Sequence, residues 1–333
     1  MTIKSLYGFS PKLAPFADRT PAEQVATLRA WGSTAVFGGY ENPDFVEAVH
    51  AAGMKIYAEF GCFFGESWWQ RLPASRPTTD SGEPLENEGW YYGVNPSLPE
   101  ARQERLEAWA RLLADYPLDG AWLDFIRWPC HWEVHAPYLP RTSFDADTLA
   151  RFGRDTGNQI PPGDPSARAR IVLDRYASEW TAWRCQQITS WVAEAKAVLR
   201  RIRPAAILGL FGVPWRLADR NGAILDIIGQ DYRALGQYVD VFSPMAYHLM
   251  CGHPPAWIGE VVQEIHDLSG KPVWPIIQSV DKPAPLSPEE YGECLDIALD
   301  HPASGGVLVF TLEGALSEAK LAVTRDRFRA RTA

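Results

Sequence analysis

DGAWLDFIRWP, residues 119–129, is the stretch that decides how the rest of the chain is interpreted. Its apolar residues predict a buried strand, yet Asp124 lies near the end of it and Arg127 follows before a Trp-Pro stop. A buried carboxylate costs free energy unless it is paired or used chemically. The stretch therefore predicts a strand whose carboxyl end carries either a structural ion pair or a functional acid.

Apolar runs of this kind alternate with helical patterns along the whole chain. The predicted strands cover residues 3–10, 33–40, 54–63, 118–129, 205–215, 239–250, 271–280 and 304–314. The predicted helices cover residues 20–32, 42–53, 99–116, 145–153, 173–202, 230–238, 254–270 and 287–301, with one more at the end of the chain. The strands are apolar throughout, which is typical of buried parallel strands. The pattern predicts an α/β fold, a single (β/α)₈ TIM barrel.

A doubly wound open sheet is the rival fold. It would normally carry a glycine-rich phosphate loop after its first strand, and GFSPKLAP at residues 8–15 is not such a loop. No break in composition marks a second domain, so we expect one catalytic barrel over residues 1–333. Long segments follow the third and fourth strands, at about 64–98 and 130–172, and loops of that length are usually functional.

Charge and cysteine content restrict the partners and the compartment. The formal net charge is −9 and no basic block stands out, which argues against a nucleic-acid partner. The chain shows neither a signal peptide nor a run of apolar residues long enough to cross a membrane. Its five cysteines are an odd number with scattered spacing, which favours reduced thiols in the cytoplasm. The sequence leaves the oligomeric state open.

Aromatic residues are abundant, with 14 Trp, 12 Tyr and 14 Phe. Most of them are expected to fill the core. A cleft lined by the remaining flat rings would suit the C–H faces of sugars, and also some aromatic ligands.

In a (β/α)₈ barrel the active site lies at the carboxyl ends of the strands. The polar and aromatic residues found at or just after these ends are Ser10, Glu59, Asp124, Arg127, Trp215, Asp231, Tyr247, His248, Gln278, Asp281 and Glu313. Glycoside cleavage needs two carboxyl groups flanking the scissile bond, and this set supplies several. The catalytic candidates are Asp124, Asp231 and Glu59. The candidates for binding substrate are Arg127, Trp128, Trp215, Tyr247, His248, Gln278 and Glu313.

Asp124 is the first choice among the carboxylates. Strand alternation places Trp122, Asp124 and Ile126 on one face, opposite Leu123 and Phe125. If Asp124 points inward, Arg127 would hold it ionised. The alternative is a structural ion pair that closes the top of the barrel.

The second carboxylate is open. Asp231 is either catalytic or the N-cap of the helix YRALGQY, a common role for Asp. Glu59 and Glu313 are similar candidates, and either could instead bind a sugar hydroxyl. His248 is either a hydrogen-bonding site residue or a satisfied polar group at a strand end.

Cysteines and histidines in two predicted loops raise the possibility of a metal. Cys130, His131, His135, Cys251 and His253 could in principle meet around zinc, but their spacings match no established zinc pattern. We therefore expect no metal and no cofactor.

Three segments resemble a known group of proteins. DGAWLDFIRWP resembles the DG…(L/F)D(Y/F)(I/V)R(F/Y/W)P strand-four signature of glycoside-hydrolase-like TIM-barrel families. GQDYRALGQYVDVFSPMAYH at 229–248 resembles their GQ…L…VD…PM.Y segment, and YYGVNPSLPEARQERL at 91–106 resembles their NP..PEVR segment. The resemblance spans most of residues 50–250. The resemblance implies sugar chemistry, with Asp124 as the nucleophile. The residue that acts as the acid in these families is matched less closely in this sequence.

Together these observations predict a glycoside hydrolase that uses a carboxylate pair including Asp124. Members of the resembled families usually carry export signals and extra domains, and neither is seen here, which favours an oligosaccharide or a small glycoside as substrate. Two alternatives remain open: a barrel that binds carbohydrate without cleaving it, and a metal-dependent hydrolase on the same fold. The sugar, its linkage and the stereochemical outcome are not predicted.

Overall fold

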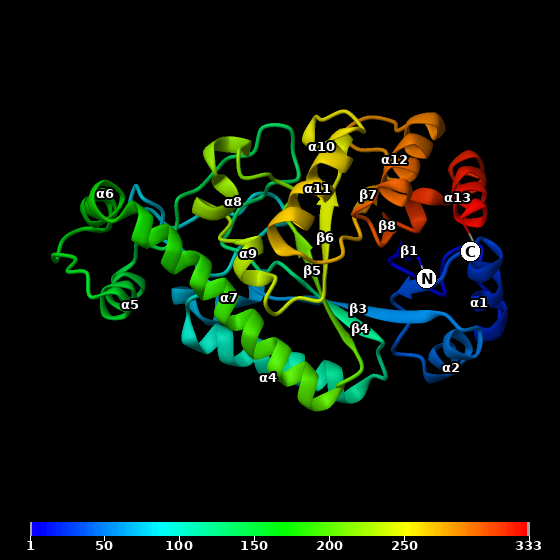
Figure 1. The fold of residues 1–333 in the computed structure, drawn as a ribbon. Helices are drawn as coiled ribbons and strands as arrows, with labels where there is room; N and C mark the ends of the chain where they lie inside the picture. The colour runs from blue at the N-terminus through cyan, green and yellow to red at the C-terminus, as the bar shows by residue number, and fades with distance from the viewer. Residues whose placement is uncertain (1, 332–333) are drawn as a thin grey trace.

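Eight parallel strands close into a barrel in the computed structural model, which describes residues 2–331 (Figure 1). The strands are β1 (Ile3–Tyr7), β2 (Ala35–Phe37), β3 (Lys55–Gly61), β4 (Gly120–Asp124), β5 (Ile207–Gly212), β6 (Val241–Ala246), β7 (Ile276–Gln278) and β8 (Gly306–Phe310). Each strand pairs with the next in sequence, and β8 pairs with β1. The predicted (β/α)₈ barrel is confirmed.

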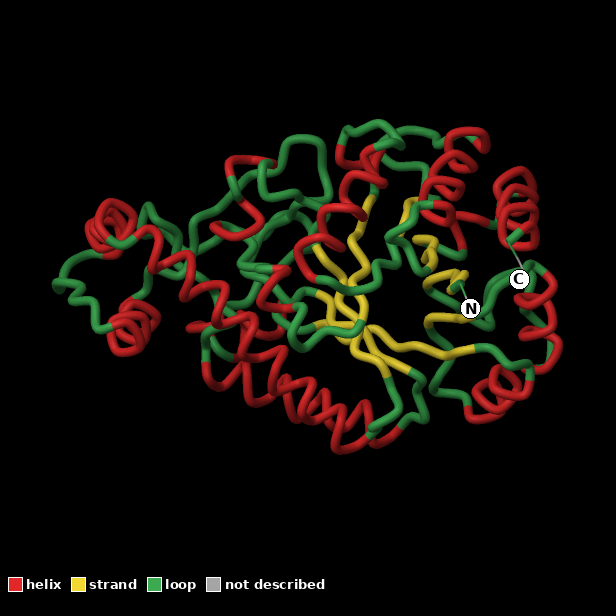
Figure 2. Tube along the Cα trace, viewed as in Figure 1, coloured by secondary structure: helices red, strands yellow, loops and turns green. Residues whose placement is uncertain are grey.

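Helices surround the strands on the outside of the barrel (Figure 2). They are α1 (Pro21–Ala30), α2 (Pro43–Ala51), α3 (Glu66–Arg71), α4 (Pro99–Asp115), α5 (Ala146–Thr156), α6 (Pro165–Arg175), α7 (Ala177–Ile202), α8 (Ala223–Asp226), α9 (Tyr232–Leu235), α10 (His248–Cys251), α11 (Trp257–Ser269), α12 (Pro288–Asp300) and α13 (Glu318–Ala330). Short 3₁₀ helices cover Pro73–Ser75, Asp219–Asn221 and Glu313–Ala315. No helix among residues 2–331 is both long and apolar enough to cross a membrane.

Element boundaries differ from the predicted ones mainly where the chain leaves a strand. Every strand is shorter than its apolar run, because the residues beyond the ladder belong to the loops at the two ends of the barrel. The single helix predicted over residues 173–202 covers the end of α6 and all of α7. These two helices are separated at Tyr176. A capping box begins α1, since Thr20 and Glu23 exchange hydrogen bonds.

The two long segments after β3 and β4 carry much of the structure outside the barrel. The first contains α3, and the second contains α5 and α6, which lie far from α1 and α13 in Figure 1. The buried Arg184 of α7 anchors the second segment, donating to the carbonyl oxygens of Thr142 (2.9 Å) and Ile227 (2.9 Å). Its guanidinium also lies 4.0 Å from the centre of the Trp128 ring. The segment that follows β4 is therefore held in place by α7.

Large aromatic side chains fill the interior of the barrel. The buried Trp122 of β4 packs against Phe37, Tyr57 and Trp274, with ring centroids 4.8–5.5 Å apart. Its indole nitrogen donates to the Ser243 hydroxyl at 3.0 Å. The ring fits because Gly209 faces it on β5: a Cβ at that position would lie 2.0 Å from the indole. A glycine on β5 thus makes room for the tryptophan on β4.

Gly209→Ala is expected to lower the free energy of unfolding by roughly 1–3 kcal/mol, because the indole is closed in on every side and must shift. The measurement is urea or thermal unfolding. Gly163→Ala is the control, since the nearest atoms to a Cβ there lie 3.9 Å away in an exposed loop. We expect that control to change stability by less than about 1 kcal/mol. Equal effects of the two substitutions would contradict the packing described.

Candidate active site

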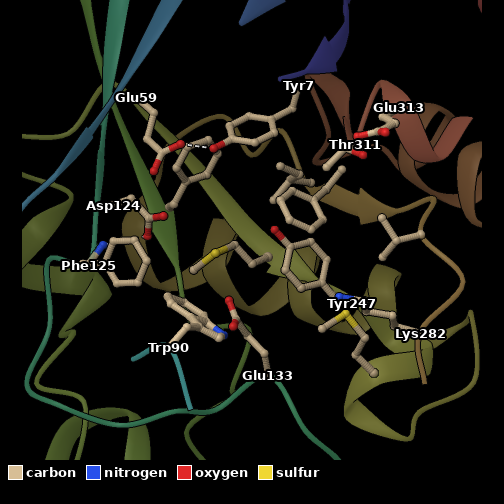
Figure 3. A pocket seen from close by; sticks show the side chains of 16 residues that line it. Tyr7, Glu59, Trp90, Asp124, Phe125, Glu133, Tyr247, Lys282, Thr311 and Glu313 are labelled. Atoms are coloured by element: carbon tan, nitrogen blue, oxygen red, sulfur yellow. Dashed lines mark hydrogen bonds between the residues drawn. The ribbon is translucent and has the colours of Figure 1, made fainter. Parts of the chain in front are cut away.

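A cavity of about 460 Å³ opens at the carboxyl ends of the strands (Figure 3). Its polar lining consists of Tyr7, Glu59, Asp124, Glu133, Tyr247, Lys282, Thr311 and Glu313, and its aromatic lining includes Trp90, Phe125, Phe211 and Phe310. The volume is within the range usual for small-molecule sites. The active-site end expected for a (β/α)₈ barrel therefore holds a cavity with carboxyl groups and aromatic rings.

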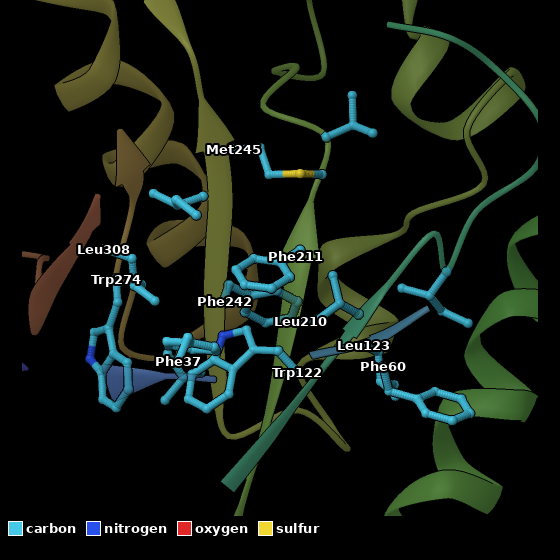
Figure 4. Packing of buried hydrophobic residues seen from close by; sticks show 14 of the residues in the cluster. Phe37, Phe60, Trp122, Leu123, Leu210, Phe211, Phe242, Met245, Trp274 and Leu308 are labelled. Carbon is cyan, nitrogen blue, oxygen red and sulfur yellow. The ribbon is translucent and has the colours of Figure 1, made fainter. Parts of the chain in front are cut away.

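The floor of the cavity is the upper layer of the barrel core (Figure 4). Phe211 of β5 and Met245 of β6 line the cavity and are themselves buried. Below them lies Trp122, whose indole N–H is taken up by the Ser243 hydroxyl. The floor is apolar, and the polar groups stand around its walls.

Asp124 is the last residue of β4 and lines the cavity. Phe125 after it has a left-handed backbone (φ 51°), and the N–H of Phe125 donates to Asp124 Oδ1 at 2.6 Å. A bulky residue rarely adopts this conformation, and such strain gathers at functional sites. The turn corrects the predicted strand over residues 118–129. Phe125 lines the cavity together with Asp124, and Ile126 is buried away from it.

Arg127 lies behind Asp124. Its guanidinium Nη1 is 3.8 Å from Asp124 Oδ1, and only 2% of the residue is exposed. Burial raises the pKa of Asp124, while the charge of Arg127, the Phe125 N–H and a hydrogen bond with Glu59 lower it. Arg127 thus stabilises the carboxylate as expected, but it does not fully offset the cost of burial. It does not line the cavity, which corrects its predicted contact with substrate.

Glu59 stands next to Asp124. The register pairs Gly61 of β3 with Asp124 of β4, so Glu59 lies two residues earlier on the neighbouring strand. Its carboxyl group shares a hydrogen bond with Asp124 and accepts another from the Tyr7 hydroxyl. Burial, followed by the nearby charge of Asp124, raises the pKa of Glu59 well above its usual range. The hydrogen bond between the two carboxyls raises the pKa of Glu59 and lowers that of Asp124, the directions expected when Glu59 is the donor.

Glu133 is another carboxyl group of the cavity, and it does not lie at the end of a predicted strand. It follows Asp124 by nine residues, in the loop that α7 anchors. Burial, reinforced by the charge of Asp124 and opposed by that of Arg127, raises the pKa of Glu133 to about 7. In Figure 3 its carboxyl group enters the cavity beside Trp90, on the side away from Tyr7. The only sequence signal was its place in an aromatic-rich loop.

Two more of the predicted residues line the cavity. Tyr247, just after β6, is buried with its ring stacked on Phe310 at 4.9 Å and on Trp132 at 5.9 Å. Glu313, just after β8, is exposed on the same wall as Thr311. Lys282, which the sequence analysis did not select, is the cationic side chain of the lining.

Asp231 lies outside this cavity. Its carboxylate accepts hydrogen bonds from the N–H groups of Arg233 (3.0 Å) and Ala234 (3.3 Å), and so caps α9. It lines a separate surface depression between α7, α8 and α9. The structure therefore corrects the catalytic expectation for Asp231 in favour of the N-cap alternative.

The two predicted tryptophans are buried elsewhere. Trp128 is fully buried, and its indole nitrogen donates to the carbonyl oxygen of Arg184 at 3.0 Å. Trp215 is also buried, with the guanidinium of Arg220 lying 5.2 Å from its ring. Neither lines the cavity, so their predicted contact with substrate is corrected.

The predicted polar residues of β7 and α10 also face away from the cavity. His248 Nε2 lies 3.0 Å from Glu290 Oε1 of α12. Gln278 accepts from the Met250 N–H (3.2 Å) and donates to the carbonyl oxygens of Val280 (2.8 Å) and Lys282 (2.5 Å). Both are fully buried. Gln278 therefore supports the rim of the cavity without contacting it.

No group of three or more His, Cys, Asp and Glu side chains within residues 2–331 is placed to hold a metal ion. The residues considered for zinc thus do not meet as a ligand set. All five cysteines are buried as free thiols.

Comparison with known proteins identifies the fold. No protein-family model matches the chain, and a search of curated proteins found no match. Solved structures do match, among them the PgaB (BpsB) glycoside hydrolase domain from Bordetella bronchiseptica. That domain has a TM-score of 0.73 at 13% identity, with 98% of this chain and 99% of that chain covered. The shared fold is the (β/α)₈ barrel.

Two longer enzymes match with lower scores. The β-galactosidase from the psychrophilic Marinomonas ef1 has a TM-score of 0.68 at 12% identity, with 98% of this chain covered. The α-L-fucosidase isoenzyme 2 from Paenibacillus thiaminolyticus has a TM-score of 0.60 at 11% identity, with 99% of this chain covered. The chain spans 59% and 49% of their respective lengths.

Proposed function

We propose that this chain is a glycoside hydrolase in which Asp124 and Glu133 are the reacting carboxyl groups. The observation that carries the proposal is that two carboxyls in different electrostatic environments line one cavity. Asp124 has a guanidinium at 3.8 Å and a backbone N–H at 2.6 Å, whereas Glu133 has a pKa of about 7. Environments that separate two carboxyl pKa values assign one group as base or nucleophile and the other as acid. The likeness in fold to glycosidases supports the same reading.

The chemistry follows from these two states. Glu133 gives its proton to the glycosidic oxygen while the bond from that oxygen to the anomeric carbon breaks. The electron pair of that bond leaves with the departing alcohol. Asp124, as the carboxylate, either attacks the anomeric carbon or removes a proton from the water that does so. One water molecule is consumed, and Glu133 ends the cycle with its proton restored.

Glu59 has a supporting role in this scheme. In this scheme its proton bridges to Asp124, and the Tyr7 hydroxyl donates to its Oε2. A neutral carboxylic acid in this place orients the Asp124 carboxylate without adding a second negative charge beside it. The pair at Glu59 and Asp124 is hydrogen-bonded, so these two groups do not flank a scissile bond, for which roughly 5–10 Å is needed.

The proposal takes residues 1–333 as one catalytic barrel whose substrate is an oligosaccharide or a small glycoside. A carbohydrate-binding barrel without activity is the alternative. It is less favoured because binding alone does not require a buried carboxyl whose pKa is close to neutral.

Release of 4-nitrophenol from a panel of chromogenic glycosides tests the proposal. The panel contains β-D-galactoside, α-L-fucoside, β-D-glucoside and N-acetyl-β-D-glucosaminide, each also offered as a disaccharide. We expect the wild-type protein to cleave at least one member and Asp124→Asn to cleave none. Proton NMR of the first product distinguishes direct attack by Asp124 from attack by water. Sugar binding without any cleavage would establish the inactive alternative.

A further inference from the structure

Trp90 is the most exposed aromatic side chain of the cavity. It is 54% exposed and is one of four large hydrophobic residues with high exposure among residues 2–331. It lies in the long segment between β3 and α4 and lines the cavity together with Asp124 and Glu133. An indole left open to solvent loses the free energy that burial would supply, so its place at the cavity mouth calls for an explanation.

The backbone under Trp90 is held by a tight turn. Glu88 and Tyr91 pair as an antiparallel bridge through two backbone hydrogen bonds of 3.1 and 3.3 Å. Gly89 supplies the left-handed residue that such a turn needs (φ 62°), and the Asn87 amide donates to its carbonyl oxygen at 2.9 Å. Trp90 therefore stands at the tip of a closed turn and not on an open strand.

Three neighbouring rings hold the indole in one orientation. Its ring meets those of Tyr91, Phe125 and His131 edge to face, at centroid distances of 5.8, 6.0 and 5.9 Å and interplanar angles of 78°, 80° and 73°. Tyr91 and Phe125 are buried, so this support is itself fixed. The arrangement is a rigid flat surface that is already formed before any ligand arrives.

The position of this surface relative to the two carboxyls sets what it can bind. Figure 3 shows Trp90 beside Glu133 and across the cavity from Tyr7. In the proposed reaction the group protonated by Glu133 is the leaving alcohol, which departs on the side opposite to attack by Asp124. Trp90 therefore borders the place that the leaving group occupies.

We propose that Trp90 forms a second sugar subsite, which takes the leaving-group ring of a disaccharide or a longer oligosaccharide. The C–H face of a pyranose is flat and apolar, and it would stack on the exposed indole face. The sugar that reacts would lie deeper, above Phe211 and between Asp124 and Tyr247. This inference rests on the proposed function for the direction of cleavage, but the binding it predicts does not require cleavage.

Isothermal titration of the full chain carrying Asp124→Asn tests the subsite, because that variant binds without turnover. The probes are three pairs: methyl β-D-galactoside with lactose, methyl β-D-glucoside with cellobiose, and methyl N-acetyl-β-D-glucosaminide with chitobiose. We expect at least one disaccharide to bind about tenfold more tightly than its methyl glycoside, the gain that stacking one apolar face supplies.

Substitutions at Trp90 then test whether the tighter binding of the disaccharide depends on this side chain. Adding Trp90→Ala should abolish the tenfold difference and leave the Kd of the methyl glycoside unchanged, and Trp90→Phe should keep part of it. Tyr138→Ala is the matched control, since Tyr138 is 59% exposed but lies outside the cavity, and it should change neither Kd.

The outcomes separate the subsite from the catalytic proposal. A disaccharide advantage that survives Trp90→Ala, equal binding of both members of every pair, or no binding at all overturns the subsite. A Trp90-dependent advantage in a protein whose wild-type form cleaves none of the panel glycosides supports the subsite while rejecting the hydrolase. Cleavage of a panel glycoside with no disaccharide advantage supports the hydrolase and rejects the subsite.

Discussion

Asp124→Asn is expected to lower kcat by at least about 10³-fold on any glycoside that the wild-type protein cleaves, because the amide neither attacks carbon nor accepts a proton from water. The fold should persist. Asparagine has the same shape, and its side-chain oxygen can still accept from the Phe125 N–H, which donates to Asp124 Oδ1 at 2.6 Å. The change also removes the cost of burying a carboxylate. Activity and thermal unfolding are measured on the same preparations.

Asp231→Asn is the matched control for Asp124→Asn. The sequence offered Asp231 as a catalytic candidate beside Asp124, but Asp231 caps α9 outside the cavity. Asparagine caps helices as well as aspartate does. The control should keep wild-type kcat and stability. Normal activity in Asp124→Asn, or loss of activity in Asp231→Asn, would contradict the assignment of the site.

Glu133→Gln is expected to lower kcat by about 10²–10⁴-fold on substrates whose leaving group is a sugar, the usual contribution of a general acid. The loss should be much smaller with a 4-nitrophenyl leaving group, since nitrophenol departs readily without protonation. A loss of kcat that is much larger for the sugar leaving group than for 4-nitrophenol indicates that the general acid has been lost. A variant that had merely unfolded would lose activity on both types equally.

The pH profile gives the same assignment independently. The active form holds the proton on Glu133, whose pKa is about 7, so wild-type kcat/KM should fall as the pH rises through about 7. Glutamine does not titrate, and this limb should be absent from the Glu133→Gln profile. Glu88→Gln is the control, because Glu88 and Glu133 lie 3.7 and 3.9 Å from the two ring nitrogens of His131, but Glu88 does not line the cavity. A basic limb that persists in Glu133→Gln would contradict the assignment of Glu133 as the acid.

The barrel and one side of its site were predictable because they depend on local pattern. Eight apolar runs separated by helical segments specify the strands, and the parallel order brings the ends of neighbouring strands together. Glu59 and Asp124 were both selected on this basis, and the structure places them in contact through the pairing of β3 with β4. Tyr247 and Glu313 were found in the same way.

The other side of the site depends on contacts between residues far apart in the sequence. The strand predicted over residues 118–129 stops at Asp124, where the left-handed Phe125 turns the chain. Trp128 therefore points into the protein toward Arg184 and not into the cavity. Glu133 and Trp90 lie in loops with no periodicity, and the rings of Tyr91, Phe125 and His131 pack around Trp90. No short-range pattern records such packing.

The loop after β4 has a consequence for how the site could be changed. Asp124, its counter-ion Arg127 and Glu133 lie within ten consecutive positions, 124–133, and the segment is fixed by the hydrogen bond from the Trp128 N–H to the Ile228 carbonyl oxygen at 2.9 Å. The two reacting groups are thus carried by one short piece of chain, held from outside by Ile228, and not by two different strands. Such a piece is modular. Inserting one residue between Trp128 and Glu133 would alter the distance between the two carboxyl groups and leave the strands of the barrel unchanged. One insertion in this segment could therefore be used to change the stereochemical outcome of the reaction.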